Sequence, residues 1–150
     1  MELTLNITIN FDMDGTIADL YGREDWLECL EAEDTSVYAE AAPLLRLATL
    51  ARKLNALQRA GYLLGVISWL SKSGSDKYNE AVAEVKREWL AKHLPSVSWD
   101  AINIVPYGTP KQMFCGNPLD ILFDDEERNR EAWTGRAYAE SQIMEILKNL

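Results

Sequence analysis

Two carboxylates, Asp12 and Asp14, stand where a short apolar segment ends, and their spacing suits them to nucleophilic and acid–base chemistry. They lie in the sequence Asp-Met-Asp-Gly-Thr at residues 12–16, after the alternating apolar residues of segment 5–11. Side chains at positions i and i+2 of an extended strand point to the same side, so both carboxylates are expected at one edge of a sheet. Crowding would separate their pKa values, leaving one ionised as a nucleophile and metal ligand and the other protonated as a general acid.

The glycine of this string, Gly15, is expected to turn the chain sharply and to leave neighbouring amides free for an anion. An ordinary Asp-Gly turn would explain Asp14 and Gly15 taken alone. The whole five-residue string arises by chance in about one of several hundred chains of this length at average residue usage. We therefore interpret it as functional.

Three further polar groups follow later apolar segments. Ser68 comes at the end of one such segment and could donate to a phosphate oxygen, although serine is also common at strand ends. Lys111 could neutralise charge on a transferring phosphoryl group, although a loop lysine is usually just solvated. The pair Asp124 and Asp125 suits a hard, oxygen-seeking cation such as magnesium, whereas the next two glutamates are typical of a helix start.

Apolar runs that alternate with helical patterns would position these groups. Strands alternating with helices predict a mostly parallel sheet covered on both faces, because parallel neighbours require a crossover connection. The predicted fold class is α/β, a doubly wound three-layer sandwich, whose ligands sit at the carboxyl ends of the strands. The predicted strands are 5–11, 62–67, 101–105, 119–123 and a short edge strand 136–138; the predicted helices are 24–31, 47–57, 75–94, 126–133 and 143–150.

Composition and charge limit the classes of function. The 150 residues, 47% hydrophobic and 26% charged, predict one globular domain over residues 1–150. A net charge of -9 opposes binding to nucleic acid or to an anionic membrane. Between Asp19 and Glu40, eight acids oppose one base, and the lack of steady apolar periodicity predicts a short acidic surface insertion at about residues 19–42.

The cysteines and the N-terminal residues bear on the cellular compartment. Cys29 and Cys115 lie far apart and the chain has a single histidine, so neither a disulfide framework nor a Cys/His zinc site is predicted. Residues 1–4 carry an acid where a signal peptide would carry a base, and the longest apolar run, 62–70, is too short to span a membrane. We expect a cytoplasmic protein.

The order of these groups resembles the four motifs of the haloacid dehalogenase superfamily of phosphatases. The matching residues are Phe11 to Thr16, then Ser68, then Lys111, then the acidic pair 124–125, and together they span most of the chain. The resemblance implies a compact core domain acting on phosphate monoesters. The acid at Asp14 is implied to direct the chemistry to phosphate, because the dehalogenase members lack an acid at that position.

The resemblance also implies a role for each residue. Asp12 would be the nucleophile that forms an aspartyl-phosphate, and Asp14 the acid that protonates the leaving oxygen and later activates water. Ser68 and Lys111 would hold the phosphoryl group. Mg²⁺ would be bound by Asp12, by the backbone carbonyl of Asp14 and by Asp124, with Asp125 in direct or water-mediated support.

The length of the insertion predicts only a minimal cap, and substrate choice stays open. We expect a small phosphorylated metabolite such as a nucleoside monophosphate, with Trp69, Tyr21 or Trp26 as possible surfaces for a base. Nucleic acid and membranes are not expected partners. Two alternatives remain. A receiver domain is disfavoured because it carries its acidic pair after the first strand, and an idle member of the same fold would serve as a binding or regulatory module.

Overall fold

Strand β1 (Thr8–Phe11) lies in the middle of a five-stranded sheet with the order β5-β4-β1-β6-β7. The computed structural model describes residues 6–150. All four neighbouring pairs of strands are parallel, which confirms the predicted sheet. Because the strands run the same way, their carboxyl ends lie at one edge. The other strands are β4 (Leu63–Trp69), β5 (Ala101–Val105), β6 (Ile121–Phe123) and β7 (Arg136–Tyr138).

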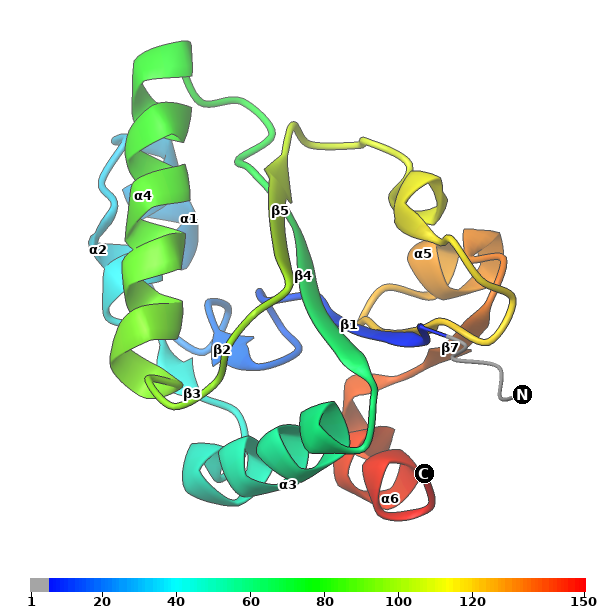
Figure 1. Ribbon diagram of the computed structural model, residues 1–150. Coiled ribbons are helices and arrows are strands. Elements are labelled where there is room, and N and C mark those ends of the chain that lie inside the picture. Colours follow the sequence, from blue (N-terminus) through cyan, green and yellow to red (C-terminus); the bar gives the residue numbers. More distant parts are fainter. Residues whose placement is uncertain (1–5) are drawn as a thin grey trace.

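Helices cover both faces of this sheet, as Figure 1 shows for α4 on one side and α5 on the other. Period-two alternation in the strands explains the layers, since Phe11 and Phe123 stack on one face while Leu122 lies on the other with Trp133. No helix within residues 6–150 is long and apolar enough to cross a membrane. The first face carries α3 (Leu47–Arg59), α4 (Asp76–His93) and α6 (Ile143–Lys148); the second carries α5 (Glu127–Ala132) and the 3-10 helix η1 (Lys111–Phe114), and η2 (Glu140–Gln142) precedes α6.

Local signals set the ends of the long helices. Gly61, with a φ of 110°, stops α3 in the left-handed conformation that glycine adopts without strain. Ser75 caps α4 by accepting a hydrogen bond from the backbone amide of Tyr78 at 3.1 Å. The predicted first strand began at residue 5, which lies outside the described residues. Strand β4 continues to Trp69, one residue beyond Ser68, so this serine is inside the strand rather than at its end.

The acidic segment 19–42 leaves the core and returns to it beside the carboxyl edge of the sheet. Strand β2 (Ala18–Asp19) pairs with β3 (Ala42–Pro43) in antiparallel fashion, which ties the two ends of the segment together. Between them lie α1 (Trp26–Glu31), as predicted, and a second short helix, α2 (Ser36–Ala39), which was not. A separate apolar cluster fastens the segment to α4; it contains Leu20, Cys29, Val37, Tyr38, Tyr78 and Val82. We call residues 19–42 the cap.

Candidate active site

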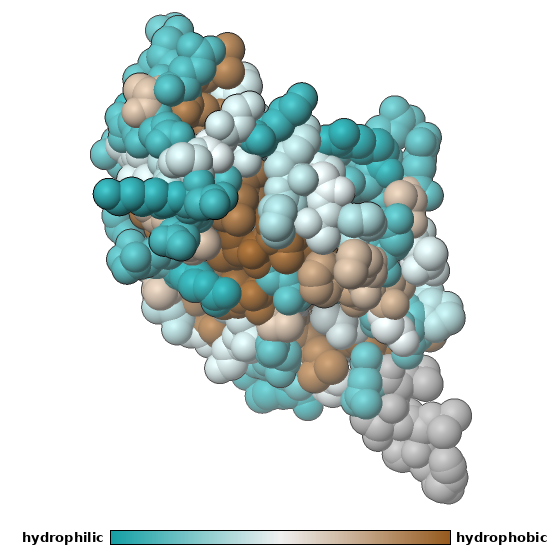
Figure 2. Space-filling model, turned by 90° about the horizontal axis from the view of Figure 1, so that it is seen from above, coloured by the Kyte–Doolittle hydropathy of each residue, from teal (hydrophilic) through white to brown (hydrophobic). Residues whose placement is uncertain are grey.

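A cavity of about 620 Å³ lies where the carboxyl ends of the central strands face the cap. Figure 2 views the molecule from this end and shows hydrophobic side chains gathered in the hollow. Of the residues that the sequence singled out, Asp12, Asp14, Lys111, Asp124 and Asp125 line the cavity. These side chains come from loops far apart in the chain, and the parallel sheet brings them together.

The carboxylate of Asp12 is held at both oxygens. Lys111 Nζ donates to its Oδ1 at 2.8 Å, and Thr16 Oγ1 donates to its Oδ2 at 2.8 Å. The backbone amide of Asp12 donates to the carbonyl oxygen of Phe123 at 2.9 Å, which continues the pairing of β1 with β6 beyond the last strand residue. Asp12 is therefore a buried carboxylate in one fixed orientation at the bottom of the cavity. Thr16 belongs to the Asp-Met-Asp-Gly-Thr string, but the sequence predicted no role for its side chain.

Asp12, Asp124 and Asp125 form a group that could hold a metal ion. One carboxylate oxygen from each lies within 4.8 Å of the others. Asp124 is fully buried, and its Oδ1 accepts from the backbone amide of Glu126 at 2.9 Å while its Oδ2 accepts from Asn129 Nδ2 at 3.1 Å. Three carboxylates offer the oxygen ligands that hard cations such as Mg²⁺ prefer, so the donor set fits that metal.

The two acids of the pair have raised pKa values, chiefly because they are buried and in part because other carboxylates lie close to them. Burial, and then the charge of Asp12, raises the pKa of Asp124 to about 6, although Lys111 opposes the shift. Burial and the neighbouring Asp12 carboxylate raise the pKa of Asp125 to about 8. A divalent cation among these oxygens would compensate the repulsion between them.

Lys111 is the cation that the protein itself supplies to this group. Its Nζ lies 2.8 Å from Asp12 Oδ1 and 2.8 Å from Asp124 Oδ2, and its side chain is buried. Burial by itself lowers the pKa of Lys111, but the charges of Asp12 and Asp124 outweigh it and raise the pKa above the ordinary value. The lysine is therefore charged at any physiological pH.

The turn after β1 brings Gly15 against Asp125. Gly15 has a φ of 83°, and a Cβ there would collide with the Asp125 carboxylate, so only glycine fits. The expectation of free amides in this turn is wrong at two positions. The Gly15 amide donates to the Ala18 carbonyl at 2.9 Å and the Thr16 amide donates to the Met13 carbonyl at 3.0 Å. These amides brace the turn and are not available to an anion.

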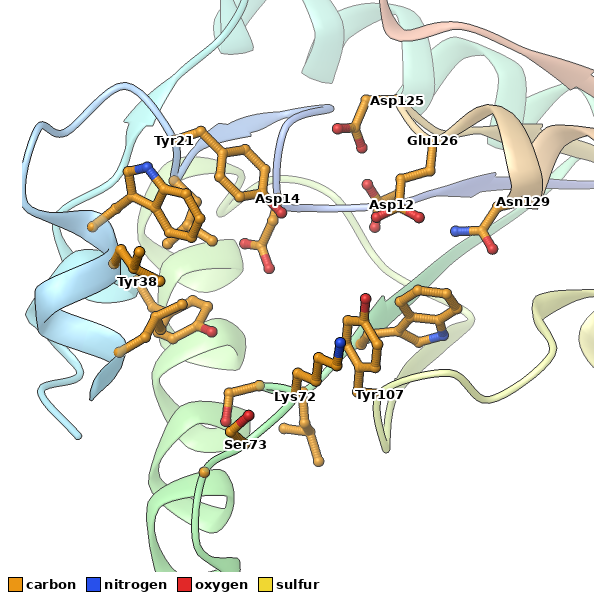
Figure 3. A pocket seen from close by; sticks show the side chains of 18 of the residues that line it. Asp12, Asp14, Tyr21, Tyr38, Lys72, Ser73, Tyr107, Asp125, Glu126 and Asn129 are labelled. Atoms are coloured by element: carbon orange, nitrogen blue, oxygen red, sulfur yellow. The ribbon is translucent and has the colours of Figure 1, made fainter. Parts of the chain in front are cut away.

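Asp14 lines the same cavity as Asp12 but has a different partner. Its Oδ2 accepts a hydrogen bond from Lys86 Nζ at 2.8 Å (Figure 3 shows Asp14 at the centre of the site). Burial raises the pKa of Asp14, and Lys86 opposes that shift. The direction is the one expected for a general acid, but the chief cause is burial and not crowding by Asp12, whose charge adds less.

Sequence reasoning missed Lys86, which lies on the buried face of α4. The structure places Ser68 beside it, so that Ser68 is fully buried and its Oγ accepts from Lys86 Nζ at 2.7 Å. Ser68 is not among the residues that line the cavity. A signal for Lys86 was present, because it lies four residues after the buried Val82 and three before the buried Trp89, where an apolar residue is expected.

Aromatic side chains form two opposite walls of the cavity, as Figure 3 shows for Tyr21 and Tyr38 of the cap and Tyr107 across from them. Tyr21 packs edge-on against Trp26, with ring centroids 5.0 Å apart, and remains 47% exposed. The ring of Trp69 is less available, because Tyr107 packs against it at 4.9 Å and the Arg128 guanidinium lies 4.8 Å from its centroid. The cap thus forms one wall of the site.

Comparisons with known proteins find a likeness in structure. No family model matches the sequence, and no curated protein matches it. Among solved structures, the D,D-heptose 1,7-bisphosphate phosphatase from Burkholderia thailandensis matches 84% of this chain and 70% of its own, with a TM-score of 0.50 and 18% identity. At that identity the likeness shows the fold, and that phosphatase belongs to the haloacid dehalogenase superfamily. The resemblance read from the motifs is therefore confirmed at the level of the fold.

Proposed function

We propose that the protein is a magnesium-dependent phosphomonoester hydrolase that acts through an aspartyl-phosphate on Asp12. One observation carries the proposal. A buried carboxylate, oriented at both oxygens, lies within metal-binding distance of Asp124 and Asp125 at the bottom of an open cavity. A carboxylate held only for stability would not require two further acids at the same place, because their mutual repulsion is unfavourable.

The proposed reaction has two steps. In the first, an oxygen of Asp12 attacks phosphorus, the bond between phosphorus and the leaving oxygen breaks, and Asp14 donates a proton to that oxygen. In the second, Asp14 accepts a proton from a water molecule, the water oxygen attacks phosphorus, and the bond to Asp12 breaks to release inorganic phosphate. Asp12 is then free and Asp14 again carries its proton, so the cycle closes.

Charge at the site must be balanced before an anionic substrate can approach Asp12. Asp12, Asp124 and Asp125, with the backbone carbonyl of Asp14, would hold Mg²⁺, which supplies positive charge to the phosphoryl oxygens when it is bound. Lys111 adds a fixed positive charge at 2.8 Å from the nucleophile. In this proposal Lys111 and Ser68 also help to hold the phosphoryl group. For Ser68 this requires a rearrangement, since its hydroxyl is buried against Lys86 and does not line the cavity.

The cavity and the charge of the chain favour a small substrate with a ring. A volume of about 620 Å³ suits a molecule the size of a nucleotide. Tyr21 is better placed than Trp69 to stack on a base; Tyr107, on the opposite wall, is also exposed, but its ring packs against Trp69 and lies near Lys72 and Arg128. The net charge of -9 repels a polynucleotide with many phosphates far more than a single phosphomonoester. We therefore propose a nucleoside monophosphate as the substrate class.

Phosphate release by the purified protein tests the proposal. With Mg²⁺ present, we expect turnover of a deoxynucleoside monophosphate to exceed that of a sugar phosphate and of a phosphorylated oligonucleotide, and we expect EDTA to stop it. Inorganic phosphate is measured for all three at physiological salt. A preference for the oligonucleotide would contradict the substrate class alone. No turnover of any of the three, with or without metal, would favour a binding or regulatory role instead.

The two acids that follow β6 should differ in their effect on the metal. Asp124 is fully buried and aimed at Asp12, whereas Asp125 is partly exposed, so we expect Asp124→Asn to weaken Mg²⁺ affinity more than Asp125→Asn. Asparagine keeps an oxygen for the Glu126 amide, but its NH2 group replaces the oxygen that accepts from Lys111 and Asn129, so each variant is compared with its own melting temperature in EDTA. The rise in melting temperature with added Mg²⁺ measures the affinity. Equal responses in the parent and Asp124→Asn would exclude Asp124 as a ligand.

A further inference from the structure

Lys86 is a charged residue buried in the interior of the protein. Lys86 is only 1% exposed, and it lies on the face of α4 that packs against the sheet and the cap. Burying an ammonium group is costly unless every donor finds a partner, and a well-packed apolar side chain would stabilise the same position at least as well. Val82 and Trp89 occupy the neighbouring positions on this face and are apolar. Stability therefore gives no reason for a lysine here.

All three N–H donors of Lys86 have acceptors. Nζ lies 2.8 Å from Asp14 Oδ2, 2.7 Å from Ser68 Oγ and 2.7 Å from the backbone carbonyl oxygen of Trp69. The ring of Tyr38, from the cap, lies 5.1 Å from the same nitrogen. A saturated ammonium has no donor left for a substrate, so Lys86 can act only through the groups it holds.

Those groups belong to the proposed machinery. Asp14 Oδ2 is engaged by Lys86, and no hydrogen bond within residues 6–150 engages the other oxygen, Oδ1. A carboxyl group bonded at one oxygen is fixed in rotation about its side chain, which leaves the second oxygen to face the cavity. Ser68 is held by the same nitrogen, so one side chain ties together groups from the turn after β1 and from β4.

We infer that Lys86 is a positioning residue that holds Asp14 Oδ2 so that Oδ1 meets the leaving oxygen of the substrate. The inference rests on the proposed function, because it assigns Asp14 the transfer of a proton to the leaving group. Its consequence is specific to the first step: loss of Lys86 slows formation of the phosphoenzyme when the leaving oxygen needs that proton and spares it when the leaving oxygen does not. The second step, in which Asp14 activates water, is common to all substrates. Orientation of a reacting group is worth a large factor, since small displacements from productive geometry lower rates steeply.

The test compares two leaving groups in the parent and in Lys86→Met, which keeps the length of the side chain. The leaving group of a deoxynucleoside monophosphate is the nucleoside, whose oxygen would be a strongly basic alkoxide and needs the proton. The leaving group of p-nitrophenyl phosphate is p-nitrophenolate, a stable anion that leaves without it. We expect kcat/KM, which reports the steps up to formation of the phosphoenzyme, to fall by about 10²-fold for the nucleotide, within the range that general acid catalysis contributes, and far less for p-nitrophenyl phosphate. Equal losses for both substrates would overturn the inference and indicate a structural role.

Two further variants separate positioning from folding. Val82→Ala removes buried atoms one turn earlier on α4 without touching Asp14, so it should lower the melting temperature and leave the ratio of the two rates unchanged. The double variant with Lys86→Met and Asp14→Asn should lose little more nucleotide turnover than Asp14→Asn alone, because both changes remove the same interaction. Additive losses would contradict the inference. If Lys86→Met fails to fold, Lys86→Leu, which also lacks a donor, takes its place.

A crystal structure of the Lys86 variant gives a result that does not depend on activity. The Asp14 carboxylate should turn away from its position in the parent once Oδ2 has no partner. An Asp14 carboxylate that keeps its place would overturn the inference even if the protein hydrolyses no phosphate. Failure of the parent to hydrolyse either substrate would instead contradict the proposed function, so the two failures are distinguishable.

Discussion

Asp12→Asn should abolish phosphatase turnover, because an amide oxygen does not form the phosphoenzyme. Asp14→Asn should lower turnover by roughly 10²–10⁴-fold, the usual contribution of a positioned acid and base. Steady-state release of inorganic phosphate measures both effects. Neither change should unfold the protein, since an asparagine oxygen can still accept from Lys111 or Thr16 at position 12 and from Lys86 at position 14.

Circular dichroism and the melting temperature provide the controls for these two variants. Asp25→Asn, an exposed carboxylate on the outside of the cap that pairs with Arg23, serves as the matched substitution and should keep full activity. A parent-like rate in Asp12→Asn, on an aryl phosphate or on a nucleotide, would exclude the aspartyl-phosphate mechanism.

Lys111→Met should have the largest effect on the stability of the protein without metal. The buried Nζ neutralises Asp12 and Asp124 at 2.8 Å each, and its removal leaves two buried carboxylates close together. Breaking a buried ion pair by deleting one partner costs about 3–5 kcal/mol. We expect the free energy of unfolding in EDTA to fall by about that amount. Phosphatase turnover should also fall.

Mg²⁺ distinguishes loss of charge from loss of packing in this variant. If Lys111 acts by neutralising the carboxylates, Mg²⁺ should raise the melting temperature of Lys111→Met more than that of the parent, since the cation replaces the missing charge. Urea unfolding in EDTA and in Mg²⁺ measures both quantities. Lys77→Met, an exposed lysine on α4, is the matched control and should change little. The prediction fails if the two lysine variants have the same stability in EDTA.

Patterns within one element were enough to predict most of the fold. The alternation before Asp12 and the helical stripe in α3 both reflect burial of apolar side chains, and burial is visible in the order of apolar residues. Strands separated by helices leave few arrangements other than a parallel sheet, because crossover connections are right-handed and short. The edge strand β7 was predicted for the same reason, and it lies at the edge of the sheet.

The cap was harder to predict because its stability comes from another part of the chain. Helix α2 has four residues, too few to be stable alone, and it persists because Val37 and Tyr38 pack against α4. That contact joins parts of the chain about 40 positions apart. The hydrogen bond that Tyr78 Oη donates to the Asp34 carbonyl, for example, joins residues 44 positions apart. Local periodicity carries no information on such a contact.

The set of candidate catalytic carboxylates follows from the order of Asp12, Asp14 and Asp124 at successive strand ends, since a parallel sheet must bring such ends together. The partners of those carboxylates follow only from the tertiary structure. The sequence places Lys86 on the apolar face of α4, but its partners appear only when α4 is packed, because its buried ammonium must then find Asp14 and Ser68. The same packing turns Ser68 inward and makes the cap a wall of the site, because only the folded chain decides which polar groups lose their solvent.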